Sequence, residues 1–153
     1  MPQVFAHVRN SFDLTVHAAY RDAAPLFGPN GERGWSEGDW DPQFFYPQPG
    51  KDIEGAVFSI RQGSTESIWV NTVFDLEARH FQYVYFVPDT LVTTIDVNFV
   101  PVDAMNTKVT VVYTRTALDV GANGHVRQLG EKDSKSAEQW QKAINDYVEK
   151  HKR

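Results

Sequence analysis

The feature that most constrains this chain is a run of five strand-length segments between Ile53 and Leu118, with no helical pattern between them. The segments are rich in Val, Ile, Thr, Tyr and Phe, which suit the pleated and half-buried surface of a sheet. Because the connections between the segments are short, neighbouring strands must be antiparallel. The run therefore predicts a curved antiparallel sheet. The five segments are 53–61, 67–74, 80–87, 90–100 and 108–118.

The N-terminal part of the chain adds two strands and a short helix to this prediction. Residues 3–13 alternate between apolar and polar side chains, which is typical of a strand. The apolar residues of 16–27 stand at helical spacing and predict a short helix. Residues 35–47 are aromatic and acidic by turns, and we expect them to form the second strand of a seven-stranded sheet.

The C-terminal segment changes to a helical period after Gly121 and Asn123. Its apolar positions step by three and four residues, so they share one face of a helix. Gly130 weakens this helix by about 1 kcal/mol relative to Ala. We predict one helix of about 28 residues, which spans ~40 Å and can cover the sheet. The shared face consists of Val126, Leu129, Asp133, Ala137, Trp140, Ile144 and Tyr147 or Val148.

The composition is that of one globular domain spanning residues 1–153. A chain of 153 residues buries roughly two thirds of its unfolded surface, which is enough for a core without disulfides or metal. The absence of cysteine excludes disulfides, thiolate nucleophiles and zinc–thiolate sites. The N-terminal residues lack the basic and apolar regions of a secretory signal, and no apolar run approaches the ~18 residues of a membrane span. We therefore expect a cytoplasmic protein.

The net charge of −5 is unevenly distributed along the chain. From His125 onward there are 7 Lys or Arg against 5 Asp or Glu, whereas the preceding residues carry 8 against 15. Nucleic-acid binding requires clustered Lys and Arg for phosphate contacts, so the acidic body argues against that class of partner. The basic residues at the end of the chain are those favoured at a helix C-terminus.

Three local features, together with the order of the elements, resemble one superfamily. They are the stretch Trp40-Asp41-Pro42, the segment Ile68-Trp69-Val70 followed by Phe74-Asp75, and the segment Val111-Val112-Tyr113 followed by Thr116-Ala117-Leu118 and the Trp140 helix. This pattern resembles the SRPBCC superfamily, which includes START-like, Bet v 1-like and polyketide cyclase/dehydratase-like proteins. The resemblance implies a helix-grip fold, in which a curved seven-stranded antiparallel sheet wraps around one long C-terminal helix, with one or two short helices after the first strand.

A sheet that grips a single helix leaves a cavity, and aromatic residues are well placed to line it. Tyr83 and Tyr85 share one face of their strand, Tyr113 shares a face with Arg115, and Trp140 lies on the apolar face of the helix. Ligand pockets combine apolar walls with a few polar groups in this way. The alternative is that the aromatic side chains simply fill the core. The predicted cavity residues are Trp40, Asp41, Trp69, Asn71, Tyr83, Tyr85, Tyr113, Arg115 and Trp140.

The charged candidates need partners that the sequence does not identify uniquely. An inward Arg115 requires a carboxylate, which could come from Asp41, Glu54 or an acidic ligand. If a bulge reverses the register of its strand, Arg115 lies on the surface instead. Glu37, Asp39 and Asp41 alternate and would share one face of a strand, either as a solvated edge or as a cation or proton site.

The sequence contains no metal-binding, nucleophile or phosphate-loop motif. The histidines lack the spacing of a helical metal pair, and neither a Gly-x-Ser-x-Gly elbow nor a GxGxxG loop occurs. We therefore expect no metal and no cofactor. The favoured function is binding of a small hydrophobic or aromatic molecule between the sheet and the helix, and the alternative is a polyketide cyclase/dehydratase-like enzyme that uses acid–base groups in the same cavity. Docking of another protein and formation of a homodimer remain open.

Overall fold

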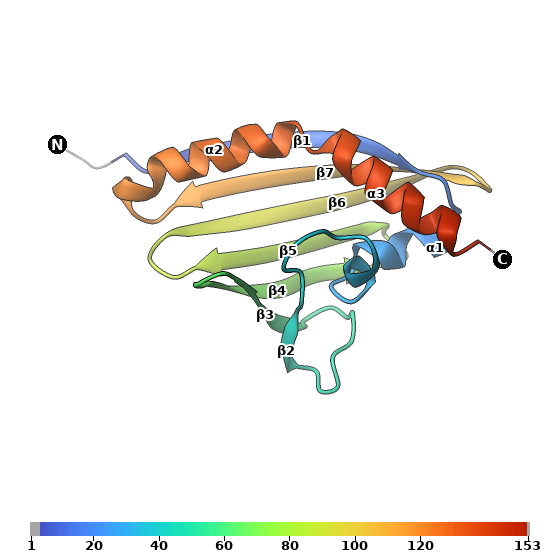
Figure 1. Ribbon diagram of the computed structural model, residues 1–153, viewed down its shortest axis with the longest axis horizontal. Helices are drawn as coiled ribbons and strands as arrows, with labels where there is room; N and C mark the ends of the chain where they lie inside the picture. Colours follow the sequence, from blue (N-terminus) through green and yellow to red (C-terminus); the bar gives the residue numbers. More distant parts are fainter. Residues whose placement is uncertain (1–3, 153) are drawn as a thin grey trace.

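The computed structural model describes residues 4–152 and contains one antiparallel sheet in the order β1-β7-β6-β5-β4-β3-β2 (Figure 1). Strands β3 to β7 follow one another as hairpins, and β1 pairs with β7. The first and last strands of the sequence therefore lie side by side. The strands are β1 (His7–Val16), β2 (Gln43–Tyr46), β3 (Val57–Gln62), β4 (Thr65–Asp75), β5 (His80–Val87), β6 (Leu91–Asp103) and β7 (Asn106–Ala117).

The five consecutive predicted strands are all present, and β5 has the bounds predicted for it, residues 80–87. The predicted second strand is mostly wrong, because only Gln43–Tyr46 of residues 35–47 forms a strand. Gly38 in this segment adopts a positive φ of 80°, and the side chain of Trp40 donates a hydrogen bond to the Pro29 carbonyl. The segment folds onto the residues before it instead of pairing along the sheet. The residues before it form α1 (Tyr20–Ala23) and the 3-10 helices η1 (Ala24–Phe27) and η2 (Gly31–Gly34).

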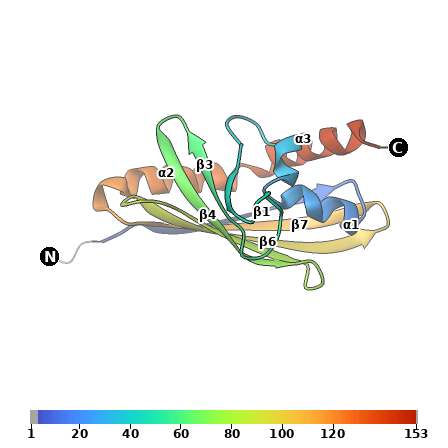
Figure 2. The same cartoon turned by 90° about the horizontal axis from the view of Figure 1, so that it is seen from below.

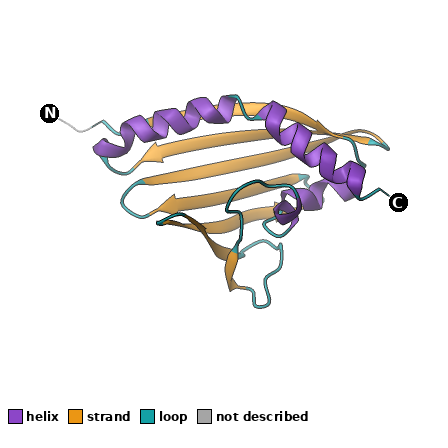
Figure 3. Cartoon of the chain, in the orientation of Figure 1, coloured by secondary structure: helices purple, strands orange, loops and turns teal. Residues whose placement is uncertain are grey.

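The predicted single C-terminal helix is divided into two helices, α2 (Asn123–Ser134) and α3 (Ala137–Lys150), after the short 3-10 helix η3 (Val120–Ala122) (Figure 3). The hydroxyl of Ser134 donates to the Glu131 carbonyl, and that of Ser136 donates to the Lys132 carbonyl. Serine hydroxyls that bond back to helix carbonyls bend helices. The two serines thus mark the break, which the apolar period of the sequence does not reveal.

The C-terminal helices cover one face of the sheet and leave the other face open (Figure 2). Gly130 is the point at which α2 approaches β1, because a Cβ atom there would lie 2.9 Å from both Asn10 Nδ2 and Val8 Cγ2. Ile144 of α3 is fully buried and contributes to the main core. Helix α3 therefore packs on the core, and α2 lies over the opposite end of the long strands.

Candidate functional site

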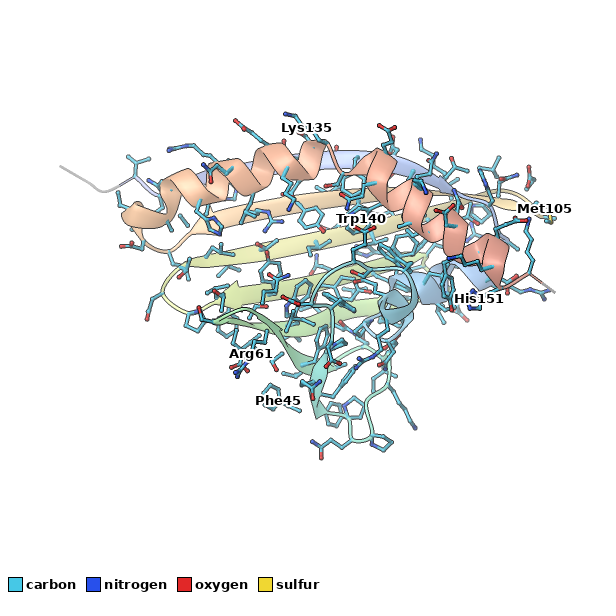
Figure 4. All side chains as sticks on the ribbon, viewed as in Figure 1. Phe45, Arg61, Met105, Lys135, Trp140 and His151 are labelled. Atoms are coloured by element: carbon cyan, nitrogen blue, oxygen red, sulfur yellow. The ribbon has the colours of Figure 1, made fainter. Side chains whose placement is uncertain are left out.

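A cavity of about 490 Å³ lies between the inner face of the sheet, the C-terminal helices and the segment that contains η1 and η2. Its walls combine aromatic rings with a few charged groups. In Figure 4, Trp140 extends from α3 toward this interior, whereas Lys135 points away from the sheet. The residues that line the cavity include Glu32, Trp35, Trp40, Trp69, Tyr83, Tyr85, Ile95, Tyr113, Arg115, Lys132 and Trp140.

The register of the sheet brings the inner side chains together in rows. Trp69 lies opposite Tyr85, Tyr85 opposite Thr93, and Thr93 opposite Arg115. Because side chains alternate between the faces of a strand, all members of a row point to the same side. The aromatic side chains of β5 and β7 therefore point toward the cavity, as expected. The adjacent row consists of Asn71, Tyr83, Ile95 and Tyr113.

Arg115 is buried, and its partner is Asp133 of α2. Its Nε and Nη2 atoms donate to the two carboxylate oxygens of Asp133 at 2.6 and 2.8 Å. Nη1 also donates to Tyr85 Oη at 2.5 Å, and the guanidinium lies 4.8 Å from the ring centroid of Tyr113. Burial alone would lower the pKa of Arg115, but the hydrogen bonds with Asp133 raise it above its ordinary value. The cavity thus contains an arginine whose charge is already compensated.

This pairing corrects the predictions for Arg115. The surface location is wrong, and neither Asp41 nor Glu54 is the partner carboxylate. Asp133 could have been found in the sequence, because it is the acidic member of the otherwise apolar face of the C-terminal segment. A carboxylate on a buried helix face requires a cationic partner on the sheet.

Three of the four tryptophans that line the cavity donate their N–H groups to the protein itself. Trp35 Nε1 donates to the Leu26 carbonyl at 2.7 Å, and Trp69 Nε1 donates to Ser67 Oγ at 2.8 Å. Trp40 Nε1 donates to the Pro29 carbonyl at 2.9 Å. The rings of Trp69 and Tyr85 are stacked with centroids 4.3 Å apart, and Trp40 meets Trp69 edge to face at 5.4 Å. These side chains therefore present ring surfaces, and no free N–H donors, to the cavity.

Glu32, on η2, is a cavity residue that the sequence analysis missed. It is half-buried and lines the cavity, and among the described residues 4–152 no hydrogen bond to its carboxyl oxygens is found. Burial raises the pKa of Glu32 well above its usual value, and the nearby charge of Asp52 raises it further. The carboxylate of Asp52 accepts the backbone N–H groups of Asn30 and Gly31 at 2.9 and 3.1 Å. The two acidic groups therefore differ, since Asp52 is bonded to the backbone while Glu32 faces the cavity.

No local pattern in the sequence distinguishes Glu32 from other acidic residues. It enters the cavity because η2 folds back against η1. Gly31 permits this close approach, since a Cβ atom there would lie 1.8 Å from the carbonyl oxygen of Pro25. Only the fold of this irregular segment reveals the residue.

Burial and the nearby charges change the pKa values of two tyrosines of the cavity, Tyr83 and Tyr113. Tyr83 donates a hydrogen bond to the Phe27 carbonyl, and burial, followed by the charge of Glu32, raises its pKa well above the ordinary value. The pKa of Tyr113 is also raised well above its usual value by burial, while the Arg115 charge opposes the shift. Both phenols are therefore neutral under ordinary conditions. Glu32, Tyr83 and Tyr113 lie close enough for their charges to interact.

Seven of the nine predicted residues line the cavity, and Asp41 and Asn71 do not. The Asp41 side chain is 68% exposed and forms an ion pair with Arg33 at 2.5 Å. Asn71 is fully buried beside a bulge in β4, where its Nδ2 atom donates to the Ile53 carbonyl. Asp41 is excluded because its segment is not a strand, and Asn71 because the core closes around it.

Within residues 4–152, no three His, Asp or Glu side chains are grouped closely enough to hold a metal ion. None of the helices described in residues 4–152 is long and apolar enough to cross a membrane. The charged groups that line the cavity include Arg115, which is paired with Asp133, the carboxyl of Glu32, and Lys132 on α2.

Comparison with protein-family models gives no match, and no curated protein matches the sequence. Similar folds do occur among solved structures. Ara h 8.0201 superposes with a TM-score of 0.70 at 14% identity, with 95% of this chain and 100% of that chain covered. Norcoclaurine synthase from Thalictrum flavum, in complex with dopamine and hydroxybenzaldehyde, has a TM-score of 0.65 at 14% identity and covers 97% of this chain and 90% of that chain.

A third similar structure is the di-domain ARO/CYC protein BexL from the BE-7585A biosynthetic pathway. Its TM-score is 0.68 at 17% identity, with 93% of this chain and 46% of that chain covered. In all three cases the likeness extends over nearly the whole of this chain. The protein therefore has the Bet v 1-like helix-grip fold.

Proposed function

We propose that this protein binds a small hydrophobic or aromatic molecule in the cavity between the sheet and the C-terminal helices. The observation that carries the proposal is a space of about 490 Å³ walled largely by aromatic rings, in which Trp35, Trp40 and Trp69 donate their N–H groups to the protein. Such a space lies within the roughly 300–1,000 Å³ typical of small-molecule sites. Flat aromatic walls favour a flat, largely apolar ligand through stacking and burial of its surface.

The structural comparisons agree in kind with this proposal. One similar structure contains dopamine and hydroxybenzaldehyde, both small aromatic molecules, and another is an ARO/CYC protein of a biosynthetic pathway. A shared fold does not transfer an activity, so the identity of the ligand must come from the residues of this cavity.

Glu32 favours acid–base catalysis as a second candidate function. A protonated carboxyl group beside Tyr83 and Tyr113 can donate a proton to a bound carbonyl or hydroxyl group and then act as a base. This is the chemistry of a cyclase/dehydratase-like enzyme acting on a folded aromatic or polyketide-like substrate. The carrier and the enzyme would use the same cavity, and they differ in whether a bound molecule is released unchanged.

Titration with a neutral apolar fluorophore, N-phenyl-1-naphthylamine, tests cavity binding. We expect saturable binding near one molecule per chain, abolished by Ala143→Phe, which places a ring inside the cavity from α3. Phe45→Ala is the matched control, because Phe45 is 58% exposed and lies away from the cavity. Binding that survives Ala143→Phe in a folded variant, or no binding to the wild type, would reject the proposal. Mass spectrometry of any co-purified molecule before and after incubation separates carrier from enzyme.

A further inference from the structure

We propose that the cavity receives a small aromatic amine in its protonated form, with the ammonium group held by Glu32 between the rings of Trp40, Trp69 and Tyr83. This inference rests on the proposed binding function and specifies the chemical class of the ligand. It assigns a role to the carboxyl group that the apolar walls do not explain.

The first support is that Arg33, next to Glu32 in the sequence, and Arg115, on the cavity wall, are bonded to other groups. Arg33 donates to Asn30 Oδ1, Asp41 Oδ1 and the Pro42 carbonyl at 2.9, 2.5 and 2.7 Å. Arg115 is neutralised by its two hydrogen bonds with Asp133. Within residues 4–152 no salt bridge to Glu32 is found. A half-buried carboxylate that faces a cavity is stabilised by a nearby opposite charge, so a cationic group of the ligand would complete the site.

The second support is a recess beside the main cavity. It has a volume of about 10 Å³ and is lined by Pro29, Glu32, Trp40, Phe58, Trp69 and Tyr83. This volume is about the space that a single water molecule needs. The exposed surface of the recess is apolar. Glu32, Trp40, Trp69 and Tyr83 line both spaces, so an ammonium group would meet the Glu32 carboxyl from the main cavity, beside the rings that the two spaces share.

The third support is the electrostatic character of the recess walls. The faces of aromatic rings carry negative potential and attract ammonium groups, most strongly in the case of Trp. The N–H groups of Trp40 and Trp69 and the hydroxyl of Tyr83 are directed to protein oxygens, so they offer Glu32 no hydrogen bond. Asp52 adds a further negative charge near Glu32. A carboxylate with negative ring faces around it selects a cation over an anion of the same shape.

The cationic side chains that line the cavity do not occupy this position. Lys132 and His125 come from α2, where both are exposed, whereas Glu32 comes from η2. Neither Lys132 nor His125 is among the residues that line the recess beside Glu32. The recess therefore has no cation of its own within the described chain.

Three ligands of nearly equal shape test the assignment by isothermal titration calorimetry on the whole protein. Tryptamine is cationic, tryptophol is its neutral counterpart and indole-3-propionate is anionic. We expect tryptamine to bind about tenfold or more tightly than tryptophol, as a charge-assisted hydrogen bond in a desolvated site provides. Indole-3-propionate should bind most weakly.

Glu32→Gln should remove the preference for tryptamine over tryptophol. Asp39→Asn is the matched control, because it removes an exposed carboxylate seven positions along the same segment and should retain the preference. Equal affinities of the wild type for tryptamine and tryptophol, or a preference that persists in Glu32→Gln, would overturn the assignment. The wild-type comparison decides the matter even if Glu32→Gln does not fold.

The outcomes also separate this inference from the proposed function. If the neutral fluorophore binds and tryptamine does not, the amine assignment fails and the binding function stands. Tighter binding of tryptophol than of tryptamine would give Glu32 the role of a neutral hydrogen-bond donor and would likewise overturn the assignment. If neither the fluorophore nor any indole compound binds, the proposed function itself fails.

Discussion

Arg115 on β7 and Asp133 on α2 form a buried bidentate ion pair that joins the sheet to the first C-terminal helix. The side chains are only 6% and 8% exposed, respectively. The pair lies at the cavity wall, since Arg115 also bonds to Tyr85 and packs on Tyr113. It therefore couples the position of α2 to the aromatic residues that would contact a ligand.

Breaking this pair from one side should strongly destabilise the protein. Asp133→Ala leaves the guanidinium buried without a partner, and we expect a loss of about 3–5 kcal/mol in the free energy of unfolding, measured in urea. The double variant Arg115→Met/Asp133→Leu should recover most of that loss, because it removes both charges. Glu66→Gln breaks the exposed pair of Arg61 and Glu66 and serves as control, with an expected effect below about 1 kcal/mol. A similar small effect for Asp133→Ala would show that the pair is not closed in solution.

Glu32 should make the stability of the ligand-free protein depend on pH in a defined direction. Its pKa in the folded state is raised above the usual 4.5, so the folded state holds the proton more tightly than the unfolded state. The free energy of unfolding therefore falls as the pH rises from about the usual value through the raised one. The titratable groups whose charges interact with that of Glu32 are Asp52, Tyr83 and Tyr113.

Glu32→Gln removes this proton equilibrium. The free energy of unfolding of the variant minus that of the wild type should therefore be larger at pH 8 than at pH 4. Urea unfolding of both proteins across this range measures the difference. Asp39→Asn should show no such trend, because Asp39 is exposed. A difference between wild type and Glu32→Gln that does not change with pH would contradict a buried carboxyl group at this position.

Two glycines of α2 should respond oppositely to alanine. Gly124→Ala meets no atom within 4 Å and should stabilise the helix by up to about 1 kcal/mol through helix propensity. Gly130→Ala would bring a Cβ atom to 2.9 Å from Val8 Cγ2 and Asn10 Nδ2, and we expect a loss of about 1–3 kcal/mol. Thermal unfolding of the two variants compares them directly. A stabilising Gly130→Ala would mean that α2 lies farther from β1.

The predicted features that depend on local periodicity agree well with the structure. The five hairpin-connected strands follow from alternation and short connections, and these properties act over a few residues. The inward faces of β5 and β7 follow in turn, because alternation places Tyr83 with Tyr85 and Tyr113 with Arg115. The break between α2 and α3 escaped prediction, since it depends on where the hydroxyls of Ser134 and Ser136 bond.

The sequence by itself determined the class of the fold, the order of its strands and most of the aromatic cavity wall, because side-chain alternation and apolar spacing are local properties. Only the tertiary structure decided which charges face the cavity. Asp133 meets Arg115 through the packing of α2 on the sheet, and Glu32 enters because an irregular segment folds back at Gly31. Long-range pairing of charges and the path of irregular segments depend on which surfaces pack together, and no local pattern records that choice.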